Sequence, residues 1–267
     1  MPQSLPESHI PVIVGVGEIT DKPATPAEGL EPLALMQEAL RRAENDAGAK
    51  LVQQIDSVDI INLVSWRYAD PAQQLVDRLG IKPKRAVYGP VGGEGPMRYL
   101  HEAALRIQRG ESIVGAVCGA EAQSTVNKAQ KDNIKLPWTP FAEDGVASVR
   151  SASYQNPMAV ALGVFQPITV YPFYDAATAA SWGQTPREAL RESSELWSTF
   201  SKVAASNPNS WLKRAFEPDA IMTPTADNRL IAWPYNKLMV ANPMVNQGSA
   251  LIVTSLANAK ALGIPPE

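Results

Sequence analysis

The sequence predicts an α/β protein whose mainly parallel sheet is covered by helices and interrupted by a long irregular segment. Short apolar runs alternate with amphipathic patterns up to Glu121, and this alternation is typical of parallel strands joined by helical crossovers. The alternation then stops, because residues 122–183 mix polar turns, prolines and aromatic residues. Such a segment is too long and irregular for a simple connection, so we expect an inserted subdomain.

Glycine and proline residues mark the elements in the first part of the chain. Pro32 opens a predicted helix that ends at Gly48. Asp70 is the expected N-cap of a second helix, which ends at Gly80. Apolar residues recur along one face of the first helix, namely Leu33, Met36, Leu40 and Ala43. The predicted strands in this part are Val12–Val16, Val58–Val64 and Arg85–Tyr88.

The stretch from Val87 to Thr125 organises the predicted sheet. Glycines at 92, 93 and 95 permit a tight turn that can approach a ligand closely. Pro96 then starts a helix that ends at Gly110, with an apolar face made of Met97, Leu100, Ala104 and Ile107. Ser112–Val117 is a predicted buried strand, and Cys118–Glu121 is the expected turn at its carboxyl end. Ligands bind at the carboxyl ends of strands in open α/β sheets, so we expect the site near Gly92–Gly95 and Cys118–Glu121.

The second part of the chain contains one strong helix signal. Thr185 and Glu188 form a capping box around Pro186, and the helix that they start is expected to end near Asn207. Residues 217–247 are again irregular. A final strand at Ala250–Thr254 and a short helix around Leu256–Leu262 complete the prediction.

Composition excludes several classes of function. A net charge of −3 gives no electrostatic reason to expect nucleic acid or a membrane as partner. One cysteine and two histidines leave no basis for a disulfide or a metal site. No apolar run approaches the roughly 20 residues that span a bilayer, and the N-terminus has no signal-peptide pattern. We therefore expect a cytoplasmic protein without a metal.

Several segments, taken together and in order, resemble the thiolase superfamily, above all its sterol-carrier-type and acetyl-CoA acetyltransferase-like members. The glycine turn and helix at 91–110 resemble the segment that carries the nucleophilic cysteine, and 112–125 resembles the following strand and its G-G-x-E turn. Residues 182–211 resemble the Y-G-x-T-x-E helix that runs to an Asn-Pro. NQGSALIVTS at 246–255 resembles the strand that closes the N-terminal half, and 259–265 resembles the A-x-x-x-G-I-x-P that follows it.

The resemblance implies a fold and a division into domains. It implies a five-stranded mixed sheet covered by helices, built from residues 1–121 and 245–267, with a mainly helical loop domain inserted at 122–244. The C-terminal half of the family, which carries the catalytic histidine and a second cysteine, has no counterpart in this sequence. Losing that half exposes an apolar face, so we expect a homodimer, a partner subunit or a longer polypeptide.

The resemblance places Gly93 at the position of the nucleophilic cysteine and Cys118 at the first glycine of the G-G-x-E turn. Cys118 is either a displaced nucleophile or, more in keeping with a lone cysteine, a buried apolar thiol. Glu94 is either a general base or a solvated, helix-capping carboxylate. His101 is either catalytic or packed and neutral against its helix. Glu121 matches a family residue that anchors the turn.

Two further groups of residues have alternative interpretations. The aromatic residues Trp138, Phe141, Tyr171 and Tyr174 either cover an adenine or pantetheine group or form the core of the insert. Gly92, Gly93 and Gly95 are the expected ligand-binding glycines. They do not form a nucleotide loop, because the Lys-Ser/Thr of a P-loop and the G-x-G-x-x-G spacing are missing.

Three functional hypotheses follow, and all take a CoA thioester as substrate or ligand and need no further cofactor. The first is acyl transfer of the thiolase type, which requires a thiolate nucleophile. The second is retro-aldol cleavage of a carbon–carbon bond in a CoA thioester with a partner subunit, which requires no cysteine. The third is a non-catalytic module that binds acyl-CoA or acts as a scaffold.

Overall fold

The computed structural model describes residues 5–145 and 156–266, which form two compact units. The first unit contains the described residues up to 145 and from 244 onward, and the second contains 156–243. Residues 122–145 therefore belong with the sheet, and the inserted domain expected at 122–244 stays a prediction.

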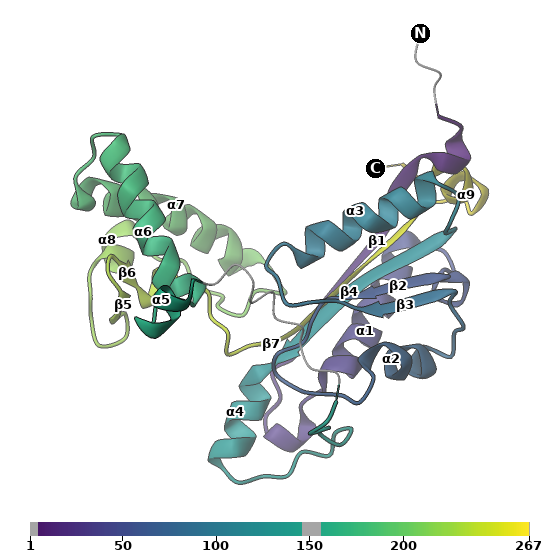
Figure 1. Ribbon diagram of the computed structural model, residues 1–267, viewed down its shortest axis with the longest axis horizontal. Helices are drawn as coiled ribbons and strands as arrows, with labels where there is room; N and C mark the ends of the chain where they lie inside the picture. The colour runs from purple at the N-terminus through teal and green to yellow at the C-terminus, as the bar shows by residue number, and fades with distance from the viewer. Residues whose placement is uncertain (1–4, 146–155, 267) are drawn as a thin grey trace. The chain divides into compact units, whose positions relative to one another are not determined.

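The first unit is built on a five-stranded mixed sheet, which confirms the expected architecture (Figure 1). The strand order is β1 (Pro11–Thr20), β7 (Asn246–Ser255), β4 (Val114–Ala122), β2 (Ser57–Ile60) and β3 (Arg85–Tyr88). The β4–β2 and β2–β3 pairs are parallel. The β1–β7 and β7–β4 pairs are antiparallel, so the sheet is not mainly parallel. The difference arises because the last strand of the chain inserts between the first and the fourth.

Strand β4 is longer than the sequence predicts, and the turn expected at Cys118–Glu121 is wrong. These residues continue the strand and pair with β7, from Cys118 opposite Ala250 to Ala122 opposite Asn246. Gly119 does not make a turn. It makes room for a neighbouring side chain, because a Cβ at this position would lie 2.9 Å from Cβ of Ile61.

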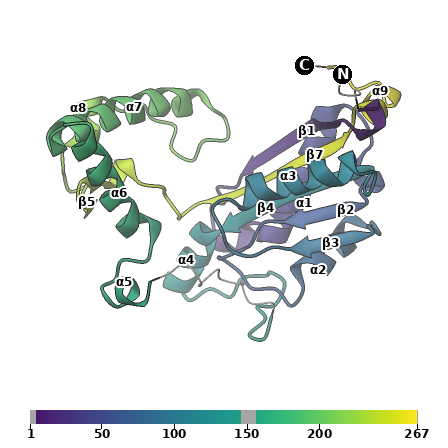
Figure 2. The same ribbon diagram turned by 45° about the horizontal axis from the view of Figure 1, so that its top comes forward.

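Helices cover both faces of the sheet. Figure 2 shows α3 (Gly95–Gln108) on one face and α1 (Pro32–Ala47) and α2 (Pro71–Leu79) on the other. The predicted boundaries of α1 and α2 are confirmed, since Gly48 and Gly80 end them with left-handed φ angles of 65° and 64°. The Asp70 carboxylate caps α2 by accepting a hydrogen bond of 3.0 Å from the Gln73 N–H. The larger hydrophobic core lies on the α1 and α2 side of the sheet.

Short elements complete the first unit. They are the helices α4 (Gln123–Lys131) and α9 (Leu256–Ala261) and the 3₁₀ turns Glu7–His9, Pro26–Glu28 and Val52–Gln54. Helix α4 falls within the segment expected to be irregular, and α9 matches the short helix expected after the final strand.

The buried face of helix α3 shares only Ile107 with the face that the sequence predicts. Its buried residues are Gly95, Tyr99, Ala103 and Ile107, whereas the Met97 side chain is 71% exposed. Tyr99 and Ala103 pack on Val117 of β4 in a small second core. The prediction was wrong because the apolar residues Met97, Leu100 and Ala104 repeat at helical spacing one position away from the face that contacts the sheet.

A buried ion cluster lies beneath α3. The Asp59 side chain on β2 is fully buried and pairs with Arg85 of β3 at 2.6 Å and with Arg106 of α3. A buried carboxylate is stable only when charged partners and hydrogen bonds replace its water. Asp59 therefore ties the helix to two parallel strands.

The second unit is helical with one small hairpin. Its helices are α5 (Pro157–Ala161), α6 (Pro167–Ser181), α7 (Pro186–Ser206) and α8 (Pro218–Met222), its strands are β5 (Leu230–Ala232) and β6 (Tyr235–Asn236), and a 3₁₀ turn spans Lys237–Met239. The capping box of Thr185 and Glu188 at the start of α7 is confirmed. Helix α6 was not expected, because it contains Pro172 and its apolar residues do not gather on one face.

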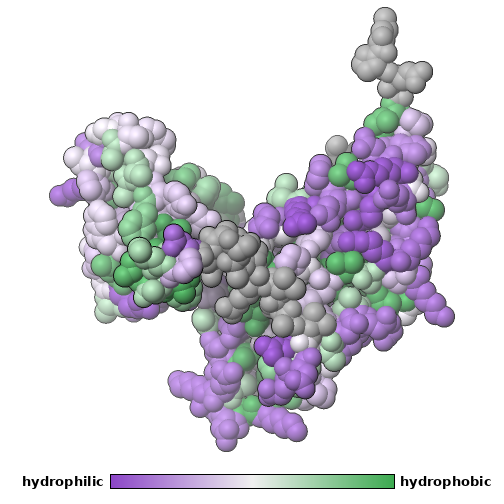
Figure 3. All heavy atoms as spheres, viewed as in Figure 1, coloured by the Kyte–Doolittle hydropathy of each residue, from purple (hydrophilic) through white to green (hydrophobic). Residues whose placement is uncertain are grey.

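The surfaces of the two units differ in character. In Figure 3 polar residues dominate the visible face of the first unit, whereas pale and hydrophobic residues are prominent on the second. The exposed apolar side chains of α5 and α6 include Met158, Tyr171, Phe173 and Tyr174. None of the described helices is long and apolar enough to cross a membrane.

Glycines on β1 and β7 allow α1 to lie directly on the strand backbones. A Cβ at Gly15 would lie 2.1 Å from the Ala43 carbonyl oxygen, and one at Gly17 would lie 2.0 Å from that of Ala39. At Gly248 the Leu35 carbonyl oxygen would be 2.9 Å away. These contacts involve backbone atoms, so a side chain at these positions would displace the helix itself.

We therefore expect Gly17→Ala to destabilise the protein by roughly 3 kcal/mol through overpacking. Urea unfolding measures the loss. Gly93→Ala is the matched control, since no described atom lies within 4 Å of a Cβ at that position, and its effect should be within about 1 kcal/mol of zero. Equal effects of the two substitutions would contradict the close contact between α1 and β1.

Candidate functional site

The carboxyl ends of the parallel strands meet at one edge of the sheet. Backbone hydrogen bonds hold the first residues beyond β2 and β3 in place, since Ile61 N–H donates to the Cys118 carbonyl at 2.8 Å and Gly89 N–H to that of Ile60 at 3.0 Å. The loop after β2 and the glycine turn after β3 therefore leave the sheet side by side. These hydrogen bonds fix the backbone at the edge where the sequence predicts ligand binding.

The glycine turn leads directly into α3. Gly95 N–H donates to the Gly92 carbonyl at 3.0 Å, and α3 starts at Gly95. Gly93 is exposed, and a side chain at this position would meet no described atom within 4 Å. Glu94 is also exposed, and its carboxylate lies over Gly92, where it would be 2.4 Å from an added Cβ. The turn thus presents open backbone and one carboxylate.

Glu121 anchors the neighbouring loop. One carboxylate oxygen accepts a hydrogen bond of 2.7 Å from Val64 N–H, and the other accepts one of 2.8 Å from Ser65 N–H. The Ser65 hydroxyl in turn accepts from Ala122 N–H at 3.0 Å. The structural role expected of Glu121 is confirmed, although it fixes the loop after β2 and not a turn of its own.

Two residues that carry no sequence signal also lie at this edge. The Asn62 side-chain amide donates to the Gly89 carbonyl at 3.1 Å, while its buried oxygen has no hydrogen-bond partner among the described residues. The buried Tyr99 phenol packs on Gly89, where an added Cβ would lie 1.9 Å from its oxygen. Burial raises the pKa of Tyr99. No local motif marks either residue, because each is defined by contacts between separate elements.

Cys118 lies inside the sheet and not at its edge. It pairs with Ile60 of β2 and Ala250 of β7, and its side chain is 2% exposed. Burial, reinforced by the charge of Asp59, raises the pKa of the thiol to about 12. The thiol is therefore neutral at physiological pH, as expected of an apolar, structural cysteine.

The remaining predicted residues do not gather at the edge. His101 is exposed on α3, so it is not packed against its helix as the alternative interpretation expected. Trp138 and Phe141 pack with Trp66 in the first unit, whereas Tyr171 and Tyr174 pair with each other in the second. The four aromatic residues thus form no single cluster. In the part of the chain that the structure describes, no group of three or more potential ligand side chains could hold a metal ion.

Comparison with known proteins identifies the architecture. No protein-family model and no curated protein matches the sequence. Among solved structures, a monomeric SCP2-thiolase-like protein type 1 (STLP1) from Mycobacterium smegmatis matches 97% of this chain and 48% of its own, with 28% identity and a TM-score of 0.74. The chain has a thiolase-like fold. The resemblance noted from the sequence is thereby confirmed at the level of the fold.

Other structures share the fold at lower identity. The Ltp2-ChsH2(DUF35) aldolase matches with 20% identity and a TM-score of 0.67, covering 97% of this chain and 58% of the other. Human mitochondrial 3-ketoacyl-CoA thiolase in complex with CoA matches with 14% identity and a TM-score of 0.53, covering 96% and 67%. This thiolase-like chain thus spans about half the length of STLP1 and less than two thirds of the aldolase chain.

The protonation of the Cys118 thiol can be tested through the dependence of stability on pH. Its folded pKa of about 12 lies above the ordinary value of 9.0, so the unfolded thiol loses its proton first as pH rises. The stability that this burial contributes is present below pH 9.0 and is lost as pH rises from 9.0 to about 12.

We expect Cys118→Ala to flatten the alkaline part of the stability profile. The fall in the free energy of unfolding between pH 9.0 and about 12 should be shallower than in the wild type, by up to about 1.4 kcal/mol per pH unit. Urea unfolding at several pH values measures this difference. Parallel profiles, or rapid alkylation of Cys118 in the folded protein at pH 8, would show that the thiol is accessible.

Proposed function

We propose that this chain is the acyl-CoA-binding part of an enzyme that makes or breaks carbon–carbon bonds in CoA thioesters without a cysteine nucleophile of its own. The observation that carries the proposal is the open glycine turn at residues 92–95. It lies at the carboxyl ends of parallel strands, where open α/β sheets bind ligands. Its exposed backbone at Gly93 leaves room for the thioester group where a thiolase would present its cysteine.

The proposed role of the turn is to stabilise negative charge on the thioester oxygen. Gly95 N–H and Arg98 N–H already donate to carbonyls of the turn and Pro96 has no N–H, so the proposed donors are the N–H groups of Gly93 and Glu94 in the exposed turn. The Glu121-anchored loop holds the other side of this edge at fixed distances from β4. Donors that are already in position stabilise an enolate without reorganisation.

Retro-aldol cleavage is the reaction that these groups support best. A base takes the proton of the β-hydroxyl group, the Cα–Cβ bond breaks, and its electron pair moves into the thioester to form an enolate. A proton returned to Cα then completes the CoA product, and the β-carbon leaves as a carbonyl compound. Glu94 is the candidate base that the turn itself provides, since its carboxylate lies on Gly92.

Thiolase-type acyl transfer has less support from this chain alone. It requires a thiolate within reach of the thioester, whereas Cys118 is buried in the sheet and Gly93 has no side chain. The names of the fold neighbours include both a thiolase bound to CoA and an aldolase with a DUF35 component. The second name supports the lyase hypothesis and a partner subunit.

A non-catalytic role in binding acyl-CoA is the second candidate. It is favoured by the sparse chemistry of the turn, where Glu94 is the single titratable side chain among residues 89–96. In that case the chain would hold the thioester and a partner would supply the proton transfers. Carbon–carbon cleavage of a β-hydroxyacyl-CoA that is lost in Glu94→Gln would exclude this candidate.

A partner for this unit is also part of the proposal. The edge strand β1 exposes Ile13 and Val16, and α3 exposes Met97. Exposed apolar side chains of this size are common at interfaces between proteins. We expect the isolated chain to form a homodimer or to bind a partner subunit, and light scattering that finds a monodisperse monomer at all concentrations would count against self-association.

Gly93→Cys tests the position of the thioester. The variant should fold normally, because the site is open and its backbone φ is not left-handed. On incubation with acetyl-CoA we expect one acetyl group on the introduced cysteine by intact mass and peptide mapping, and none on the wild type. A thiolate at this point would attack the bound carbonyl, as an oriented nucleophile does.

Lys131→Cys is the matched control, because it places an exposed cysteine on α4 of the same unit. Acetylation of both variants at the same rate would reveal random thiol reactivity and contradict the proposed site. Calorimetry with CoA and the wild type separates two further outcomes. CoA binding without acetylation at position 93 would locate the thioester elsewhere, and the lack of any CoA binding would overturn the proposal.

A further inference from the structure

A hollow of about 900 Å³ opens in the first unit, separate from the residues of the proposed active site. It lies between α4, the segment 133–141 and Trp66. Its volume is within the range of sites that bind small molecules, roughly 300–1,000 Å³. None of the side chains that line it takes part in the chemistry proposed for the glycine turn.

The walls of the hollow are largely aromatic and apolar. The ring centroid of Trp66 lies 5.0 Å from that of Trp138 and 5.3 Å from that of Phe141, with both pairs edge to face. Ile134 and Ala129 add aliphatic surface. Phe141 is 47% exposed, so part of this aromatic surface still faces water. A flat apolar ligand would bury it.

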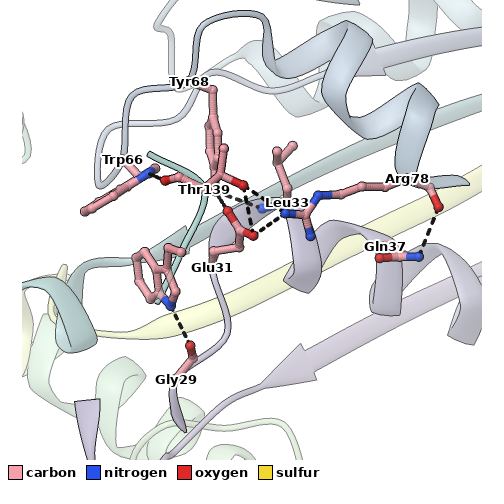
Figure 4. A network of polar contacts seen from close by, with 9 residues as sticks. Gly29, Glu31, Leu33, Gln37, Trp66, Tyr68, Arg78 and Thr139 are labelled. Atoms are coloured by element: carbon pink, nitrogen blue, oxygen red, sulfur yellow. Dashed lines mark hydrogen bonds and ion pairs between the residues drawn. The ribbon is translucent and has the colours of Figure 1, made fainter. Parts of the chain in front are cut away.

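Hydrogen bonds fix both indole rings. Trp66 donates to the Thr139 carbonyl at 3.0 Å, and Trp138 donates to that of Gly29 at 2.7 Å. The Thr139 hydroxyl joins Glu31, at 3.2 Å, and Arg78, at 2.9 Å, in the polar network that Figure 4 shows. Since both indole N–H groups are already bonded, the rings offer a ligand apolar surface and no donor.

Buried residues of the first unit hold the same network in place. The buried Tyr68 hydroxyl donates to Glu31 at 2.9 Å, and Arg78 pairs with the same carboxylate (Figure 4). Glu31 thereby connects the start of α1, the end of α2 and the loop at Thr139. The hollow is a preformed site, because its aromatic wall rests on charged groups that already satisfy one another.

The charge of the lining indicates the sign of the ligand. Lys135 is the single charged side chain among the described residues that line the hollow, and Gln130 and Asn133 add neutral polar groups. An ammonium group without a carboxylate in the same lining favours an anion. We propose that the hollow binds a planar apolar molecule that carries one anionic group, such as an aromatic carboxylate or sulfonate.

The probe for this proposal is 1-anilinonaphthalene-8-sulfonate, a planar aromatic monoanion, added to the full chain. The readout is the set of six indole N–H resonances in a proton–nitrogen correlation spectrum. Trp66 and Trp138 belong to the first unit, and the four others, at 182, 197, 211 and 233, belong to the second. We expect saturable shifts of the Trp66 and Trp138 signals. Saturable shifts confined to the second unit, or none at all, would overturn the proposal.

Two substitutions test the chemistry of binding. Lys135→Glu should raise the dissociation constant of the probe about fivefold, and Lys131→Glu, an equal change of charge on an exposed residue outside the lining, should leave it nearly unchanged. Phe141→Ala should raise it roughly tenfold by removing one aromatic wall. N-phenyl-1-naphthylamine lacks the sulfonate and should bind equally to the wild type and to Lys135→Glu.

Two results would overturn the anion site. Equal effects of Lys135→Glu and Lys131→Glu would mean that the probe responds only to the net charge of the protein. Probe binding that disappears as the chain self-associates at high concentration would show that a second copy covers the hollow. CoA binding to the glycine turn is a separate measurement, so either proposal can fail without the other.

Discussion

The contact between α1 and the bare backbones of β1 and β7 is the constraint on which the sheet unit depends. Gly15, Gly17 and Gly248 bring carbonyl groups of the helix to a distance that no side chain would permit. The apolar face of α1 is therefore fully buried, including Leu33, Met36 and Leu40. Strand β7 also pairs with β4, so the sheet holds side by side the two strands between which the second unit lies in the sequence.

Local signals made the first part of the fold predictable, and long-range pairing made the rest unpredictable. Gly48 and Gly80 end their helices with left-handed φ angles, and Asp70 caps the start of α2. These signals are local, so they can be read from a short stretch of sequence. The end of β4 depends on pairing with Asn246–Ala250, more than a hundred residues away. The buried face of α3 was missed for the same reason, since Val117 and Ile61 select Tyr99 over Met97. Helix α6 could not be predicted from local patterns, because it contains an internal proline and its apolar residues do not gather on one face.

The residues of the candidate site also fall into a group that the sequence predicts and a group that it does not. The glycine turn and the anchoring role of Glu121 follow from sequence and from the resemblance to thiolases. The neighbours that complete the edge, Asn62 and Tyr99, do not, because each takes its place through Gly89, the residue that follows β3. The hollow beside Trp66 was equally hidden. Its wall joins residues 66 and 138, whereas proximity in sequence groups Trp138 with tyrosines that belong to the second unit.

The charged groups of the sheet unit are largely committed to structure, and this limits the chemistry that the chain can perform. Asp59 is bound by two arginines, Glu121 by two backbone N–H groups, and Glu31 by Arg78 and Tyr68. Each of these carboxylates holds neighbouring elements together through the partners named. Burial raises the pKa of the Cys118 thiol, so the thiol stays protonated and is not a nucleophile. What remains at the edge of the sheet is backbone, an exposed Glu94 and open space at Gly93. Open backbone beside one exposed carboxylate is what the proposed thioester site requires, and it is the reason why Glu94 takes the role of base in the proposed cleavage.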